Sequence, residues 1–249
     1  MILTFFAISA AASEHDASAG VAPEEALKLL REGNERFVQE KAEHPNSLLD
    51  RVHETAEHGQ HPFVTILSCS DSRVPLETIF DQGIGDIFVI RVAGNVSGDG
   101  QLGSIEYGVA HTGTRLCVVL GHTKCGAITA ACTDGGHEGK VEHLMKAIAP
   151  AVKRTEAKTG KKGIDAVPDC CKENVYLQIE SLYRDSKILR DAVSNGNLVI
   201  VGAIYDIDTG KVEFLGQHPD ADSLLKTKPI RYIKPNRLER MFSTGRFSR

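Results

Sequence analysis

The sequence contains no tryptophan, and no apolar run in it approaches the roughly 18 residues that a bilayer-spanning helix needs. It also lacks a strong excess of either charge, because 29 basic and 33 acidic residues give a formal net charge of −4. These absences argue against membrane insertion and against general binding to nucleic acid. The remaining composition is that of a globular protein, and 249 residues suffice for one α/β domain with a sizeable core.

The amino terminus lacks the basic residues that usually precede a secretory signal. It does contain a short apolar run, residues 2–12, followed by two sites of the A-x-A cleavage pattern, at residues 10–12 and 17–19. We therefore interpret residues 1–21 as a signal or disordered segment and expect export, to the periplasm. The alternative is an apolar amino terminus on a cytoplasmic protein.

Short β-branched apolar runs alternate with helical patterns along the rest of the chain. The expected strands are residues 63–67, 86–92, 114–120, 198–205 and 211–215. The expected helices are residues 22–40, part of 44–60, and 102–111, 125–132, 140–158 and 171–194. This alternation predicts an α/β fold with a mostly parallel central sheet and helices on both faces. A turn at Asp206–Gly210 predicts that the last strand is an antiparallel edge strand.

No internal linker divides the chain, so residues 22–216 are expected to form a single α/β catalytic domain. Residues 217–249 form a basic carboxy-terminal arm. From Lys226 to Arg249 there are eight basic residues against the single acid Glu239. We interpret this segment as a solvated arm that packs on the body or on a partner subunit, and the alternative is that its basic residues bind an anionic surface.

The most unusual segments follow the first and third expected strands, where an open α/β sheet gathers its ligands. CSDSRVP begins at Cys69, and GHTKCG contains His122 and Cys125. If the two strands are neighbours, these three side chains come within reach of one another. Thiolate and imidazole ligands suit Zn²⁺, and three protein ligands with an open fourth position are typical of a catalytic zinc site. The alternatives are an inert buried thiol and a hydrogen-bonded core histidine.

Asp71 and Arg73 follow Cys69 closely. A carboxylate two residues from a zinc ligand can either take the fourth position or accept a hydrogen bond from water on the metal. A guanidinium two residues further on offers that carboxylate a charged, bidentate partner that keeps it ionised and off the metal. The alternative is an exposed ion pair of little energetic value.

These motifs together resemble the β-class carbonic anhydrase family. CSDSRVP, RVAGNV, SIEYGV and VVLGHTKCGAI all match the family's pattern, and the likeness covers roughly residues 23–216. The resemblance implies the family fold and one zinc ion per chain, bound by Cys69, His122 and Cys125. It also implies that Asp71 and Arg73 act as the catalytic pair, and we expect a homodimer or higher homo-oligomer.

The resemblance extends to the plant-like pocket type of the family. That pocket uses a Gln, a Phe and a Tyr around the substrate, which correspond to Gln60, Phe88 and Tyr107. Gly126 adds a backbone N–H at a helix start. The alternative for Phe88 and Tyr107 is plain core packing.

The expected reaction is the zinc-dependent, reversible hydration of carbon dioxide to bicarbonate and a proton. Two alternatives stay open. One is hydrolysis of carbon disulfide or carbonyl sulfide on the same scaffold. The other is a non-catalytic zinc or thiol-redox protein that uses the vicinal pair Cys170 and Cys171.

Overall fold

The computed structural model describes residues 20–133 and 138–226. The predicted signal run with its cleavage sites, and the basic arm from residue 227 onward, lie outside the described residues. No helix within the described ranges is both long and apolar enough to cross a membrane.

The described chain is built around a five-stranded sheet of order β2-β1-β3-β4-β5. The first four strands run parallel and β5 pairs antiparallel with β4, as the sequence predicts. β1 and β3 are buried along their whole length, which explains their continuous apolar sequences. The strands are β1 (Val64–Ser68), β2 (Ile87–Arg91), β3 (Leu116–His122), β4 (Val199–Tyr205) and β5 (Val212–Gly216).

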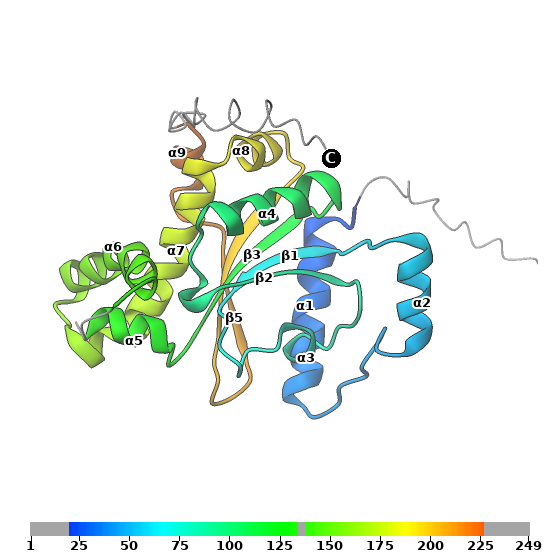
Figure 1. The fold of residues 1–249 in the computed structure, drawn as a ribbon, viewed down its shortest axis with the longest axis horizontal. Helices are drawn as coiled ribbons and strands as arrows, with labels where there is room; N and C mark the ends of the chain where they lie inside the picture. Colours follow the sequence, from blue (N-terminus) through cyan, green and yellow to red (C-terminus); the bar gives the residue numbers. More distant parts are fainter. Residues whose placement is uncertain (1–19, 134–137, 227–249) are drawn as a thin grey trace, which may run out of the picture.

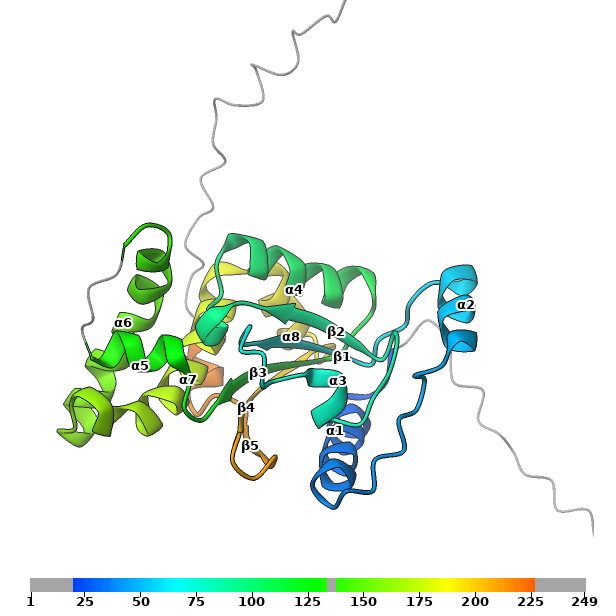
Figure 2. The ribbon, with the colours of Figure 1, turned by 60° about the horizontal axis from the view of Figure 1, so that its bottom comes forward.

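Helices cover both faces of this sheet. Figure 2 shows α4 and α8 on one side and α1 on the other, while α2 stands away from the sheet. The helices before β3 are α1 (Pro23–Val38), α2 (Leu49–His58), α3 (Leu76–Ile79), the short 3₁₀ turn η1 (Ala93–Asn95) and α4 (Asp99–His111). Those after β3 are α5 (Gly126–Cys132), α6 (Val141–Thr159), the 3₁₀ turn η2 (Gly163–Ala166), α7 (Val167–Asp185), α8 (Lys187–Ser194) and α9 (Ala221–Lys226).

The core has three parts. One apolar cluster packs α1 and α3 on the first face of the sheet, and a second packs α4, α7 and α8 on the other. A third cluster lies beyond the carboxyl ends of β1 and β3, between α5, α6, η2 and α7 (Figure 1). This third cluster contains Cys69 and Cys125, so the strand ends that carry the unusual motifs point into a separate packed lobe.

The single helix predicted from Cys171 to Ser194 is wrong in one respect, because it is two helices. Ser186, between α7 and α8, has extended backbone angles and is fully buried. Its hydroxyl donates to Glu106 Oε1 at 2.6 Å and accepts the N–H of Leu189 at 3.1 Å. A serine side chain that caps a new helix competes with continuation of the old one.

Residues 217–226, the described start of the predicted arm, pack on α7. His218 is buried, with its ring edge-on to Tyr176 at 5.3 Å and Nε2 3.4 Å from Glu180 Oε1. Leu224 and Leu225 of α9 join the second apolar cluster. This part of the arm therefore belongs to the packed body.

Candidate metal centre

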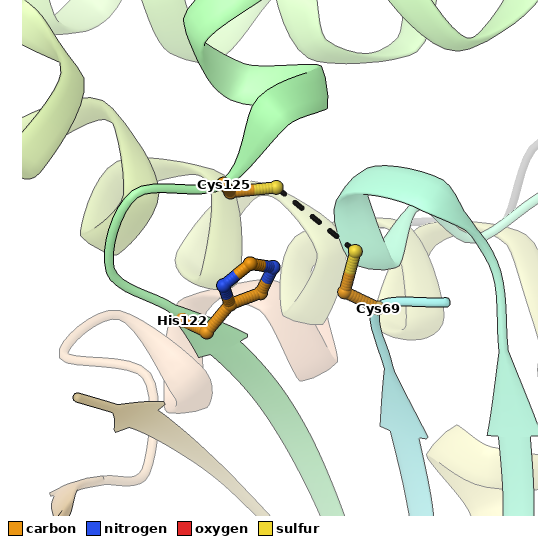
Figure 3. A group of neighbouring side chains, drawn as sticks. All are labelled: Cys69, His122 and Cys125. Carbon is orange, nitrogen blue, oxygen red and sulfur yellow. Dashed lines mark hydrogen bonds between the residues drawn. The ribbon is translucent and has the colours of Figure 1, made fainter. Parts of the chain in front are cut away.

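Two neighbouring strands bring the three predicted ligands together. Cys69 follows β1 directly, and His122 is the last residue of β3. β1 and β3 pair in parallel with Ser68 opposite Leu120, so their carboxyl ends lie at one edge. Cys125 caps the start of α5, and Figure 3 shows its sulfur, the Cys69 sulfur and the His122 ring facing one another.

A turn at Lys124 connects the two later ligands, His122 and Cys125. Lys124 has a positive φ of 54°, a left-handed conformation that is uncommon for a side-chain-bearing residue. The turn, rather than helical spacing, carries Cys125 back over His122. Lys124 is held there by its carbonyl, which accepts Arg73 Nη2 at 3.2 Å, and by its ammonium, which binds Asp208 Oδ1 at 2.6 Å.

The ligand atoms have a spacing that fits one ion. The two sulfurs are 4.0 Å apart, and the donor atoms of all three residues lie within 4.8 Å of one another. Zinc–sulfur bonds of about 2.3 Å at a tetrahedral angle would separate two sulfurs by about 3.8 Å. Cys69, His122 and Cys125 are each at most 3% exposed, so bulk water does not solvate them freely.

The hydrogen bond of His122 favours the tautomer that leaves Nε2 available to a metal. Its Nδ1 lies 2.9 Å from the carbonyl of Thr123, and because a carbonyl only accepts, Nδ1 carries the proton. The buried Nε2 therefore has a free lone pair, and it has no hydrogen-bond partner among the described residues. Burial of a polar atom without a partner costs free energy of folding. A cation bound by the two sulfurs would give Nε2 its missing partner.

The two cysteines affect each other's ionisation. Hydrogen bonding from Cys125 lowers the pKa of Cys69 despite its burial, and the N–H of Gly94, 3.3 Å from its sulfur, acts in the same direction. The pKa of Cys125 is raised, first by its hydrogen bond to Cys69 and then by burial. One thiolate thus forms readily, and a second beside it needs a positive charge between them.

Asp71 and Arg73 form the predicted bidentate pair. Arg73 Nε donates to Asp71 Oδ1 at 2.9 Å and Nη2 donates to Oδ2 at 2.8 Å. The Arg73 hydrogen bonds hold the pKa of Asp71 well below its usual value. Oδ2 of Asp71 also lies 3.9 Å from His122 Nε2. The pair therefore faces the ligand cluster and is not an isolated surface contact.

Arg91 supports this segment and was missed in the sequence. At the end of β2 it stands in register with Ser68. Its Nε donates to the carbonyl of Cys69 at 2.9 Å, and its Nη2 donates to the carbonyl of Asp71 at 2.6 Å. One guanidinium thus fixes the backbone on both sides of Ser70. The available signal was the basic residue that opens RVAGNV, at the end of an apolar strand.

The predicted substrate residues divide into two groups. Gly126 follows Cys125 at the start of α5 and is at the cluster. Phe88 and Tyr107 stack on each other with ring centroids 6.0 Å apart, but Phe88 pairs with Thr65, four residues before Cys69 and about 13 Å away along the strand. Gln60 lies beyond the opposite, amino-terminal end of β1. Within one chain, these three do not reach the ligand cluster, and their substrate role stays a prediction.

The other cysteines are buried. Cys117 lies in β3, where burial raises the pKa of its thiol to about 12. Cys132, Cys170 and Cys171 belong to the third cluster with Cys69 and Cys125. Burial likewise raises the pKa of Cys171 to about 11. Thiols held protonated in this way are poor nucleophiles.

Fold and site together define a mostly parallel α/β protein in which two cysteines and one histidine form a buried group at the carboxyl ends of adjacent strands. The sequence model of the family described as carbonic anhydrase matches residues 64–212. Carbonic anhydrase 2 of Mycobacterium tuberculosis is 39% identical over 193 residues, which cover 76% of this chain and 91% of that protein.

Solved structures agree. The β-carbonic anhydrase CafA of Aspergillus fumigatus is 29% identical, with a TM-score of 0.63 over 82% of this chain and 94% of that one. One of two tetrameric β-carbonic anhydrases from Sordaria macrospora is 26% identical, with a TM-score of 0.59 over 78% of this chain and 96% of that one. The chain belongs to the β-carbonic anhydrase family of enzymes.

Proposed function

We propose that this chain binds one zinc ion through Cys69, His122 and Cys125 and catalyses the reversible hydration of carbon dioxide to bicarbonate. The observation that carries the proposal is the arrangement at His122. Its buried, unpartnered Nε2 faces two sulfurs that are 4.0 Å apart and lies 3.9 Å from a carboxylate that another residue already holds. Such a site offers three ligands and a ready hydrogen-bond acceptor beside them.

Cys69, His122 and Cys125 would hold the zinc ion, which would supply a Lewis acid able to lower the pKa of a water molecule toward neutrality. Asp71 would contribute an ionised carboxylate beside the ligand atoms, a hydrogen-bond acceptor that can orient a water molecule there. Arg73 occupies both carboxylate oxygens, which keeps Asp71 charged and restrains it from becoming a fourth ligand. Gly126 is the first residue of α5, directly after Cys125, and the N–H groups of a helix start favour an anionic product.

A second copy of the chain is needed to bring the predicted pocket residues to a ligand cluster. These residues are Gln60, Phe88 and Tyr107. They lie away from their own ligand cluster, so if they contact substrate they do so in another subunit's site. Tyr107 is 51% exposed and is free to do so. The tetrameric relatives from Sordaria macrospora support a homo-oligomer here.

Subunit mixing tests this sharing of the site. Cys69→Ser removes a ligand, and Gln60→Ala removes a predicted pocket residue. If the site is shared, mixing the two inactive or weak variants under exchange conditions assembles some wild-type sites, and activity exceeds the sum of the two alone. If Gln60 serves its own chain, mixing restores nothing.

The alternatives predict different behaviour. The first alternative is hydrolysis of carbon disulfide or carbonyl sulfide. It requires that zinc-loaded protein hydrolyse one of these substrates faster than it hydrates carbon dioxide in a direct comparison. A thiol-redox protein requires disulfide turnover that depends on Cys170 or Cys171 and no hydration activity. Rapid hydration that persists in Cys170→Ala and Cys171→Ala excludes the second alternative.

We also propose export from the cytoplasm, on the apolar run and cleavage pattern of residues 2–19. Expression from the native gene followed by fractionation and amino-terminal sequencing tests it. A processed protein outside the cytoplasm supports export, and an unprocessed cytoplasmic protein contradicts it.

A further inference from the structure

A buried hydrogen-bond network of two amide side chains connects α7 with the candidate metal centre. Gln178 Oε1 accepts the N–H of Ser97 at 2.8 Å, and Gln178 Nε2 donates to Asn174 Oδ1 at 3.1 Å. Asn174 Nδ2 then donates to the carbonyl of Gly94 at 2.9 Å. Finally, the N–H of Gly94 points at the Cys69 sulfur, 3.3 Å away.

Asn174 and Gln178 are polar residues in an otherwise apolar environment. Asn174 is fully buried and Gln178 is 2% exposed, on one face of α7. Burying two amides is costly unless each is hydrogen-bonded, and here the bonds are made within this chain of contacts. The amides thus form a satisfied network with a defined end point, which is the Cys69 sulfur.

Gly94 needs an external anchor to hold its N–H in place. Its φ is +72°, and a Cβ there would stand 2.8 Å from Ile148 Cδ1 and 3.3 Å from the Ala127 Cβ, so only glycine fits. Glycine is also the residue whose backbone rotates most freely. The hydrogen bond from Asn174 to the Gly94 carbonyl restrains that rotation and thereby fixes the direction of the N–H.

We propose that Asn174 is a positioning residue for the metal centre, acting through Gly94 on the Cys69 thiolate, with Gln178 supporting it. An N–H that points at a thiolate withdraws charge from the sulfur and sets how strongly the sulfur donates to a metal. The turn after β2, which contains Gly94, meets α7 through the hydrogen bond from Asn174. The inference rests on the proposed metal site but not on the reaction catalysed there.

Cobalt(II) is the probe that separates this role from a structural one. Bound in place of zinc, it gives a thiolate-to-metal charge-transfer absorption whose energy reports the electron density on sulfur. In Asn174→Leu we expect this band to move to longer wavelength, because a less hydrogen-bonded thiolate donates more readily. We also expect zinc affinity, measured by competition with a chelator, to fall about 10–100-fold, because the Gly94 turn beside the Cys69 sulfur loses the hydrogen bond that holds it in place and this loss outweighs the stronger donation.

The matched control is Asn34→Leu. Asn34 is another buried asparagine, but its Nδ2 donates to the carbonyls of Ile79 and Gly210 on the opposite face of the sheet. It should lower thermal stability while leaving the cobalt band and zinc affinity at wild-type values. A band that moves equally in both variants would mean that general destabilisation explains the shift, and would overturn the proposal.

The remaining outcomes are decisive as well. If Asn174→Leu does not fold, Gln178→Met carries the test, and we expect a smaller shift in the same direction. An unchanged band and affinity in the folded variant overturn the role of Asn174. If wild-type protein itself binds neither cobalt nor zinc, the proposed function fails first, and that result is distinguishable because it needs no variant.

Discussion

Arg73 holds both carboxylate oxygens of Asp71, with Nε 2.9 Å from Oδ1 and Nη2 2.8 Å from Oδ2. The Arg73 backbone N–H adds a third contact to Oδ1 at 3.0 Å. The carboxylate is thus held by three hydrogen bonds from one residue. Its Oδ2 still lies 3.9 Å from His122 Nε2, so Arg73 restrains a carboxylate that stands beside the ligand atoms.

We therefore expect Arg73→Ala to separate metal binding from turnover. The variant should keep its fold and its zinc, since Arg73 is half-exposed and contributes no ligand. Turnover should fall at least 10–100-fold, because Asp71 loses its partner and can approach the metal. Zinc analysis together with stopped-flow carbon dioxide hydration checks this. Wild-type turnover in Arg73→Ala would show that the ion pair is only a surface contact.

Arg91 should matter for metal affinity although it contacts no ligand side chain. Arg91→Ala releases the carbonyls of Cys69 and Asp71, so the segment that carries the first ligand loses its support. We expect zinc affinity to weaken about tenfold or more. Arg115→Ala is the control, because its guanidinium contacts the Gly196 carbonyl near the amino-terminal end of β3. Equal affinities in the two variants would contradict the role of Arg91.

Asp81 should link stability to pH. Its fully buried carboxylate accepts Arg36 Nε at 2.6 Å and the N–H groups of Glu43 and His44 at 3.0 and 2.8 Å. Burial alone raises the pKa of Asp81, but these donors outweigh it and leave the pKa below its ordinary value. Asp81→Asn should therefore lower the free energy of unfolding by about 1–3 kcal/mol at neutral pH.

The sign of the pH dependence follows from the lowered pKa. A carboxyl group whose folded pKa is depressed stabilises the fold above its unfolded pKa, about 3.9, and loses that contribution as pH falls through the folded pKa. The difference in unfolding free energy between wild type and Asp81→Asn should be constant above about pH 5 and shrink below about pH 4. Urea unfolding at several pH values measures it. A difference that grows in acid would contradict this assignment.

Two glycines of α4 offer a paired test of the packing beneath Tyr107. A Cβ at Gly108 would lie 2.4 Å from Thr65 Oγ1 and 2.9 Å from Phe88 Cδ1, whereas one at Gly103 would meet nothing within 4 Å. Gly108→Ala should destabilise the protein by about 1–3 kcal/mol through overpacking. Gly103→Ala should stabilise it by about 0.5–1 kcal/mol, since alanine favours the helix. Thermal unfolding of both variants checks the opposite signs.

Much of the fold could be predicted from local patterns. β-Branched runs mark the strands, and the parallel order and antiparallel edge follow from the helical crossovers and the turn at Asp206–Gly210. The break at Ser186 could not be predicted, because it depends on a hydroxyl that reaches Glu106, eighty residues earlier in the chain. A long-range contact of this kind leaves no local signal in a helical pattern.

The candidate site, like the fold, could be predicted only in part. Cys69, His122 and Cys125 could be placed together from strand-end positions and family resemblance, and the structure brings them together as a group able to hold a metal. Their zinc remains a proposal. Arg91 and Asn174 were not predicted, because each acts on backbone groups of a segment far away in sequence. Nothing in the sequence indicates that Gln60, Phe88 and Tyr107 lie away from the metal-ligand residues of the same chain.

Zinc content and carbon dioxide hydration, measured by stopped flow on the same samples of wild type, Cys69→Ser and Cys117→Ala, test the central claim most directly. Cys117 is the matched control, a buried cysteine of β3 that is not part of the ligand group. We predict about one zinc per chain and rapid hydration in wild type and Cys117→Ala, and loss of both in Cys69→Ser. Full zinc and undiminished hydration in Cys69→Ser would contradict the account.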